Sequence, residues 1–298
     1  MIDNIIFYFI FLNQILFVSW YVPTTIIKRM QTVMEVYPPS DFPKLYSKSI
    51  ENYKNTQKKY GTLNNVLLII GFSMMSAIMM WDYLTTYQLS PMIPWAYFML
   101  QMSPLMWLEL TEFKTFKAMR VANTDTTKKA IIKPRKLFDF ISAKLLFFAI
   151  IMVLVAFAVV LVRHGFNSKA FVNIAIIIAS NLFFSGIAYW NIYGKKMDPY
   201  QANEDRLKQI KVSVKSLVYI SIGVSVFLSV HMLVKIFKLD YLQTSIMSIY
   251  CQLLVWASVS TKLKHVKLEN IDFSVYKNNE TRENNLDNNE ADHEKQQS

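Results

Sequence analysis

Long apolar runs recur along almost the whole chain, and they constrain its fold more than any other feature. A helix needs ~20 mostly apolar residues to cross the hydrocarbon core of a bilayer. Only helices satisfy every backbone polar group within one such run, so the runs predict helices rather than strands. Seven runs meet this description: Asn4–Val22, Leu63–Trp81, Met92–Leu110, Lys144–Val162, Phe171–Trp190, Leu217–Val234 and Tyr241–Ser260. We therefore expect an all-α, polytopic membrane helix bundle with seven transmembrane helices.

The first run is interpreted as a retained helix and not as a cleaved leader. The residues before it, Met1-Ile2-Asp3, carry no Lys or Arg, and the run ends at Val22-Pro23 without an Ala-x-Ala-like site. A secretory leader would show a positive start and small residues before its cleavage point.

Lys and Arg are concentrated in every second segment between the predicted spans, which places them on one side of the membrane. Of the 32 basic residues, 28 lie in residues 24–62, 111–144 and 193–216 or after residue 260. The other four are Arg163, Lys169, Lys235 and Lys238. Because cytoplasmic loops carry the excess of Lys and Arg, seven helices place the N-terminus outside and the C-terminus in the cytoplasm. The cytoplasmic face is also expected to attract anionic lipid head groups.

The C-terminal tail differs in composition from the rest of the chain. Residues 268–298 hold three basic and eight acidic residues and are rich in Asn and Gln. A segment with so few apolar residues cannot offset its ordering entropy by burial, so it is expected to be disordered. The predicted division is a transmembrane domain over residues 1–267 and a disordered acidic cytoplasmic tail over 268–298.

Two predicted cytoplasmic loops have distinctive sequences. The first contains Tyr37-Pro38-Pro39-Ser40-Asp41-Phe42-Pro43, in which three prolines forbid a helix. A helix is expected to begin at Ile50 and to lead into the second span, with Ser47 or Ser49 as its cap.

The other distinctive loop follows Gly194, which is expected to stop the fifth span. Here Asp198 followed by Pro199 predicts the start of a helix that carries Glu204 in its early part and runs into the sixth span. One hypothesis is that the two loops fold together into a contact surface for a membrane or cytoplasmic protein partner. The alternative is that they are rigid connectors on the head groups. The candidate contact residues are Tyr37, Pro38, Pro39, Asp41, Pro43, Asp198, Pro199, Glu204 and Arg206.

Neutral polar residues within the predicted spans suggest a second candidate site. Such residues seek hydrogen bonds across helices in lipid, so packing is the simplest interpretation of them. Pro104 is expected to kink the third span near Leu100, beside Gln101, and the freed carbonyl could bind a ligand. The candidate residues of this polar cavity are Gln101, Pro104, Asn181, Ser225 and Gln252.

No motif for catalysis, cofactor binding or metal binding occurs in the sequence. The six glycines are scattered, no Gly-Lys-Ser/Thr is present, and the four histidines and the single cysteine, Cys251, offer no metal-ligand spacing. The net charge of +11 is divided among loops instead of following one face, which argues against nucleic acid as a partner.

These observations favour a non-enzymatic accessory or sensor protein of a bacterial inner membrane, with no cofactor and with a cytoplasmic contact surface. The bacterial location is inferred from the short loops. The alternative function is a small-solute transporter or channel that uses the polar cavity.

Overall fold

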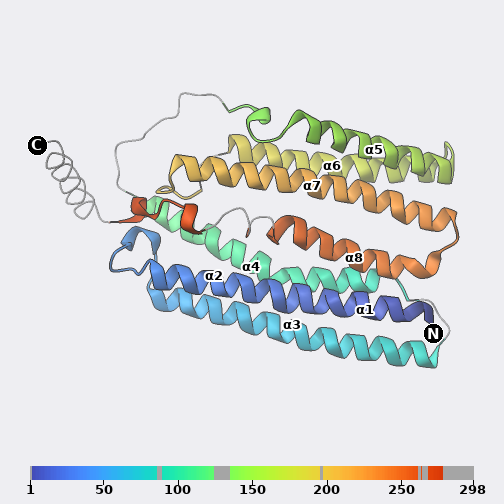
Figure 1. Ribbon diagram of the computed structural model, residues 1–298, viewed down its shortest axis with the longest axis horizontal. Coiled ribbons are helices and arrows are strands. Elements are labelled where there is room, and N and C mark those ends of the chain that lie inside the picture. Colours follow the sequence, from blue (N-terminus) through green and yellow to red (C-terminus); the bar gives the residue numbers. More distant parts are fainter. Residues whose placement is uncertain are drawn as a thin grey trace, which may run out of the picture.

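The structure is an all-α helical bundle, and its long helices lie roughly parallel to one another (Figure 1). The computed structural model describes residues 2–85, 89–123, 135–194, 197–260, 263 and 268–277. The described helices are α1 (Ile2–Leu16), α2 (Val22–Val36), α3 (Ile50–Leu84), α4 (Met92–Ala122), α5 (Ala143–His164), α6 (Ser168–Tyr193), α7 (Asn203–Ile236) and α8 (Gln243–Val255).

Each of the seven predicted spans lies within a helical segment. Among the described residues, six helices are long and apolar enough to cross a membrane. The remaining predicted span lies in α4, which is 31 residues long but lacks an equally apolar stretch of span length; this helix contains Gln101, Ser103 and Pro104. Many large apolar side chains point outward from the bundle, and within the most apolar window of α5 only 17% is buried. An apolar exterior of this kind suits lipid rather than water.

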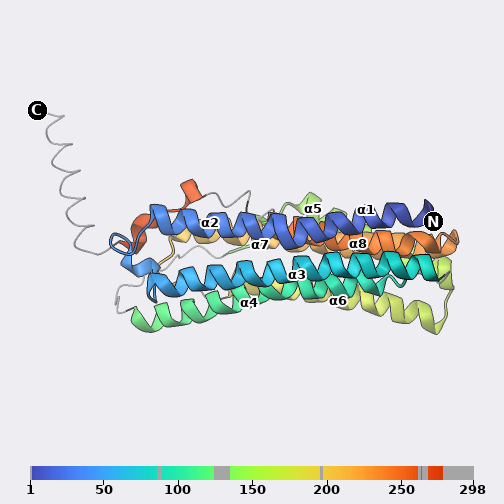
Figure 2. The same cartoon turned by 90° about the horizontal axis from the view of Figure 1, so that it is seen from below.

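The helices form two groups that are joined by α8. α7 packs against both α5 and α6, whereas α1 and α2 pack against α3, and α3 packs against α4. α8 contacts α1, α4 and α7, so it lies between the two groups, as Figure 1 shows. Figure 2 shows that α1 and α2 form one continuous rod that runs almost the full length of the bundle.

The first helix extends much further than the predicted end at Val22. A π-helical turn, Phe17–Tyr21, joins α1 to α2, and the N–H of Val22 donates to the carbonyl of Phe17 five residues earlier. Pro23 lacks an N–H and its ring would clash with the preceding turn of a regular α-helix. The wider π turn accommodates Pro23, so the helix continues to Val36.

The two ends of the bundle hold different connections. The basic end holds the α2–α3 and α6–α7 connections and residues 268–277, and the N-terminal end holds residue 2 and the α5–α6 and α7–α8 connections (Figure 1). Four helices extend beyond their predicted spans at the basic end. α3 begins at Ile50, as predicted, and α7 begins at Asn203.

Candidate functional site

The α2–α3 connection is closed by its own hydrogen bonds. The N–H groups of Asp41 and Phe42 both donate to the carbonyl of Pro38, at 3.2 and 3.0 Å. The Tyr46 hydroxyl donates a hydrogen bond to the carbonyl of Tyr37 at 2.7 Å. The pKa of Tyr46 is raised by burial and by the neighbouring Tyr53, which keeps its hydroxyl protonated as the donor. This loop is therefore a folded unit and not an extended tether.

The α6–α7 connection is also held in place, but its helix begins later than predicted. Gly194 follows the last residue of α6, as expected, whereas α7 starts at Asn203 instead of at Asp198-Pro199. The prediction that a helix starts at Asp198 is wrong, because the Asp198 carboxylate accepts other hydrogen bonds. One oxygen accepts the N–H of Tyr200 at 2.9 Å, which forms a turn, and the other accepts the Tyr276 hydroxyl. Glu204 lies in the first turn of α7, as predicted.

Arg206 stabilises the same connection from within α7. Its Nη2 donates to the carbonyl of Gly194 at 2.7 Å, so the two ends of the connection are joined. Arg120 of α4 donates from Nε to the carbonyl of Met197 at 3.0 Å. The connection is thus attached both to the helix that follows it and to α4.

Residues 268–277 of the C-terminal region fold against both loops. Leu268–Asn270 and Phe273–Tyr276 form short 3-10 turns, and the side chains of Phe273 and Tyr276 are buried. The prediction that disorder begins at Leu268 is wrong for residues 268–277. Two aromatic side chains in this segment are buried, although the average composition of the tail is polar. The rest of the predicted disordered tail, 278–298, lies outside the described residues.

The contacts of this segment join the two loops. The Phe273 ring stacks on Tyr37 with 3.7 Å between ring centroids and 19° between planes. The N–H of Asp272 donates to Oδ2 of Asp205 in α7 at 2.7 Å. Tyr276 donates to Asp198 and lies edge-on to Tyr200.

We call residues 37–46, 197–206 and 268–277 together the loop platform. Its aromatic rings are also contacted by lysines: Nζ of Lys44 lies 5.7 Å from the Tyr200 ring centroid, and Nζ of Lys277 lies 5.6 Å from that of Phe42. Such cation–π contacts add stability at half-exposed sites. Because Lys44 belongs to the first loop and Tyr200 to the other, the two loops also touch directly.

Of the predicted contact residues, some hold the platform together and others face outward. Tyr37, Asp198 and Arg206 make the contacts described above, and Pro38 accepts two of the turn hydrogen bonds. Pro43 begins a 3-10 turn, Pro43–Leu45. The half-buried Pro39 and Pro199 lie in the same connections, while Asp41 and Glu204 are exposed.

Phe273 and Tyr276, which connect the platform, were not predicted from the sequence. The available signal was two aromatic residues three apart in an otherwise polar tail. Burial and the charge of Asp198 raise the pKa of Tyr276 far above its usual range, so the hydroxyl remains a donor to that carboxylate.

The predicted polar-cavity residues separate into two places. Gln101 lies in a hydrogen-bonded cluster around Gln14 of α1, whereas Gln252 of α8 bonds to Asn13 and to the Ile10 carbonyl of the same helix. Gln14 donates from Nε2 to the Pro94 carbonyl at 3.1 Å and accepts the Ser248 hydroxyl at 2.6 Å. The cluster therefore joins α1 to α4 and α8.

Asn181 of α6 and Ser225 of α7 make their hydrogen bonds elsewhere. Asn181 accepts a hydrogen bond from Ser221, and the Ser225 hydroxyl donates to the Ser221 carbonyl at 3.2 Å. Pro104 leaves the Leu100 carbonyl without its helical donor, and the Ser103 hydroxyl supplies a bond to that carbonyl at 2.7 Å. Every buried side-chain N or O atom of the described residues has a hydrogen-bond partner.

The described residues contain no group of three or more His, Cys, Asp or Glu side chains placed to hold a metal ion. No protein-family model, curated protein or solved structure matches this chain.

Proposed function

We propose that this chain is a non-enzymatic accessory or sensor protein of a bacterial inner membrane, and that its loop platform binds a partner protein in the cytoplasm. The observation that carries the proposal is the bridge made by residues 268–277. Phe273 stacks on Tyr37 of one loop, and Tyr276 bonds to Asp198 of the other. Three segments that are distant in sequence thereby form one surface.

A folded surface of this kind suits binding better than it suits simple connection. A connector needs only to span the distance between two helices, whereas the platform has buried aromatic rings and a buried carboxylate with defined partners. Pre-organised surfaces lose less conformational entropy when they bind. The exposed side chain of Met197 remains available for contact.

The partner that we propose presents an acidic surface. Of the 32 basic residues, 28 belong to the loops and tail that are predicted to lie on the same side of the membrane as the platform. Complementary charge steers association and selects among partners. Anionic lipid head groups would meet the same positive field at the edge of the platform.

The proposed topology has seven spans, with the N-terminus outside. It counts α4 as a span because that helix is 31 residues long and packs against α3 and α8. With α4 included, the basic loops fall on one side throughout, in accord with the excess of Lys and Arg in cytoplasmic loops. The platform is then cytoplasmic.

The transporter alternative has weaker support in the geometry. Gln101 and Gln252, which prompted it, bond to side chains and carbonyls of α1. Hydrogen bonding between helices is the common role of such residues in lipid. The three pockets described for the bundle are lined by other residues.

Native mass spectrometry on protein extracted gently from host membranes tests the proposal. We expect a co-purifying protein at defined stoichiometry with the unmodified chain and its loss with Phe273→Ala. Phe166→Ala is the matched control, because Phe166 is 84% exposed at the opposite end of the bundle. A chain that carries no partner, or a partner retained equally by both variants, would refute the proposal.

A further inference from the structure

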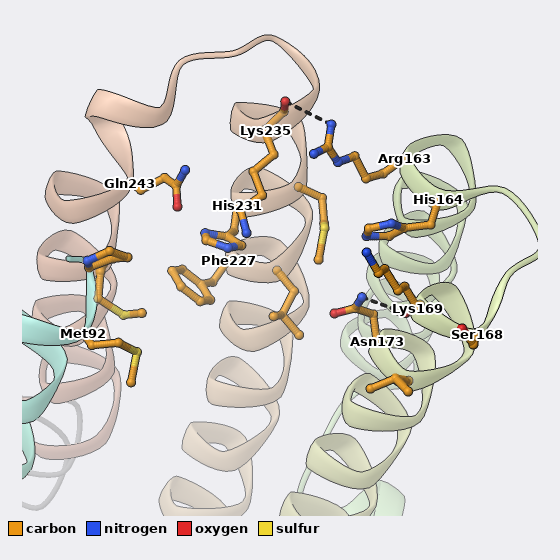
Figure 3. Close-up of a pocket in the computed structure, with 15 residues that line it drawn as sticks. Met92, Arg163, His164, Ser168, Lys169, Asn173, Phe227, His231, Lys235 and Gln243 are labelled. Atoms are coloured by element: carbon orange, nitrogen blue, oxygen red, sulfur yellow. Dashed lines mark hydrogen bonds between the residues drawn. The ribbon is translucent and has the colours of Figure 1, made fainter. Parts of the chain in front are cut away.

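A pocket with a cavity volume of about 610 Å³ opens at the N-terminal end of the bundle, opposite the loop platform. The end of α5, the first turns of α6, the last turns of α7 and the start of α8 contribute to its walls. Figure 3 shows His164 and Lys169 pointing from α5 and α6 toward the space beside α7, where His231 and Lys235 lie.

Basic side chains gather at this pocket although they are scarce on this side of the chain. Only four Lys or Arg residues fall outside the basic loops and tail, and three of them, Arg163, Lys169 and Lys235, line the pocket. His164 and His231 line it as well. Three cations around one pocket give it a positive potential, which favours the binding of negative charge.

Arg163 is held by the fold, and the lining contains no carboxylate that would neutralise the three cations. Arg163 donates from Nη1 to the backbone carbonyl of Lys235 at 3.2 Å, which connects α5 to α7 and leaves the Lys235 ammonium unaffected. The fifteen residues that line the pocket include no carboxylate. The nearby Asp240 accepts a hydrogen bond from Gln243, which is itself a lining residue.

A second, mainly apolar pocket lies next to this one. Phe227 lines both pockets, and the second has a volume of about 710 Å³ and lies between α7 and α8. The Phe227 ring is stacked between two other rings, His231 at 5.9 Å and Tyr250 at 4.1 Å between centroids. A positively charged pocket next to an apolar pocket fits a ligand with an anionic head and an apolar chain.

We propose that this pocket binds a phosphate-bearing anion through Arg163, Lys169 and Lys235. Lys and Arg are the usual partners of phosphate, and bonds between ionised groups are the strong ones. An anionic phospholipid and free phosphate share this chemistry. The inference goes beyond the proposed partner binding and does not depend on it, because the pocket and the platform lie at opposite ends.

The test uses the full-length protein in a mild detergent with two probes. Native mass spectrometry measures the retention of added phosphatidylglycerol compared with phosphatidylcholine, and calorimetry measures the binding of inorganic phosphate. The variant is Lys169→Gln with Lys235→Gln, which leaves the backbone bond of Arg163 in place. Lys238→Asn is the matched control: it removes the fourth cation, which does not line the pocket, and asparagine suits the positive φ of 56° at that position.

We expect the double variant to bind the phosphate-bearing probe about tenfold more weakly or worse, and Lys238→Asn to bind as the unmodified protein does. A preference for phosphatidylglycerol that is lost in the double variant identifies a lipid as the ligand. Phosphate binding that is lost without a lipid preference identifies a soluble anion.

The proposal is overturned if neither probe binds the unmodified protein or if the double variant binds both probes normally. Should the double variant fail to insert, Lys169→Gln alone gives the same comparison, because Lys169 is exposed in the first turn of α6. Equal binding by Lys169→Gln and Lys238→Asn would then overturn the proposal.

Discussion

Gln14 and Gln101 bind each other across α1 and α4. Nε2 of Gln14 lies 3.1 Å from Oε1 of Gln101, and Nε2 of Gln101 donates both to the Gln14 carbonyl, at 3.3 Å, and to the Ser19 hydroxyl, at 2.9 Å. Both side chains are almost fully buried. In a bilayer core such groups find partners only within the protein, so this pair fixes the register of two helices.

Gln14→Leu is expected to destabilise the bundle by about 2 kcal/mol, because it leaves Gln101 and Ser248 buried without that partner. Unfolding of the purified protein in a detergent and denaturant series measures the change. Asn173→Leu is the control, since Asn173 bonds only to a carbonyl of its own helix, and it should change stability by less than about 0.5 kcal/mol. Equal losses in both variants would contradict a special role for the pair.

Gly71 marks a close contact of α3 with α1 and α4. A Cβ atom placed there would lie 2.8 Å from Cζ of Tyr97 and 2.9 Å from Cγ2 of Ile15, closer than such atoms can approach. We expect Gly71→Ala to destabilise the bundle by about 1–3 kcal/mol through overpacking.

Gly223→Ala in α7 provides the opposite case. A Cβ atom added at Gly223 would meet no heavy atom within 4 Å, so the change should stabilise the helix by about 0.5–1 kcal/mol. The melting temperatures of the two variants, compared in the same detergent, are expected to move in opposite directions. If both variants were stabilised or both destabilised, the close contact at Gly71 would not explain the change in stability of Gly71→Ala.

The helices could be predicted from the sequence because apolar runs of span length have one solution in lipid. At the basic end, the start of α3 and the end of α6 could also be predicted, but the ends of α2 and α4 and the start of α7 could not, since there the apolar signal stops while the helix continues. Pro23 illustrates the difficulty: proline predicts a stop, but one π turn accommodates it. Asp198 illustrates another, because an Asp-Pro pair suits a helix start and also a turn, and only the tertiary contact with Tyr276 decides between them.

The candidate sites were predictable to different degrees. The unusual composition of both loops indicated the platform. The segment that joins them, residues 268–277, was not identified, because it belongs to a tail whose average composition is acidic and polar. The pocket at the N-terminal end was not predicted, although its three cations are among the few basic residues that the sequence places outside the basic loops and tail. Arg163, Lys169 and Lys235 lie on three different helices, so their spacing in the sequence does not predict that they line the same pocket.

The seven-span topology is testable with introduced cysteines. The one native cysteine, Cys251, is buried, so Cys251→Ala provides a background for labelling. Ser90→Cys and Lys117→Cys place exposed thiols near opposite ends of α4. A membrane-impermeant maleimide should label the first in intact cells and the second only after permeabilisation. Labelling of both in intact cells would show that α4 does not cross the membrane.

The docking of residues 268–277 is expected to depend on pH through Tyr276. Its pKa in the docked state is raised by burial, by Asp198 and, more weakly, by Asp205 and Asp272. The docked state therefore holds the proton more tightly, so docking is fully stable below the ordinary tyrosine pKa of about 10 and is lost as the pH rises beyond it. A spin label on Ser274→Cys, in the Cys251→Ala background, should become more mobile above that pH.

Tyr276→Phe separates this titration from that of the other tyrosines and lysines. The variant lacks the bond to Asp198 and leaves that carboxylate buried, so docking should weaken by about 1.5–3 kcal/mol at neutral pH. Its label mobility should then change little between neutral pH and pH values above about 10, because the titrating hydroxyl is gone. If the variant shows the same alkaline release as the unmodified chain, another group controls the docking.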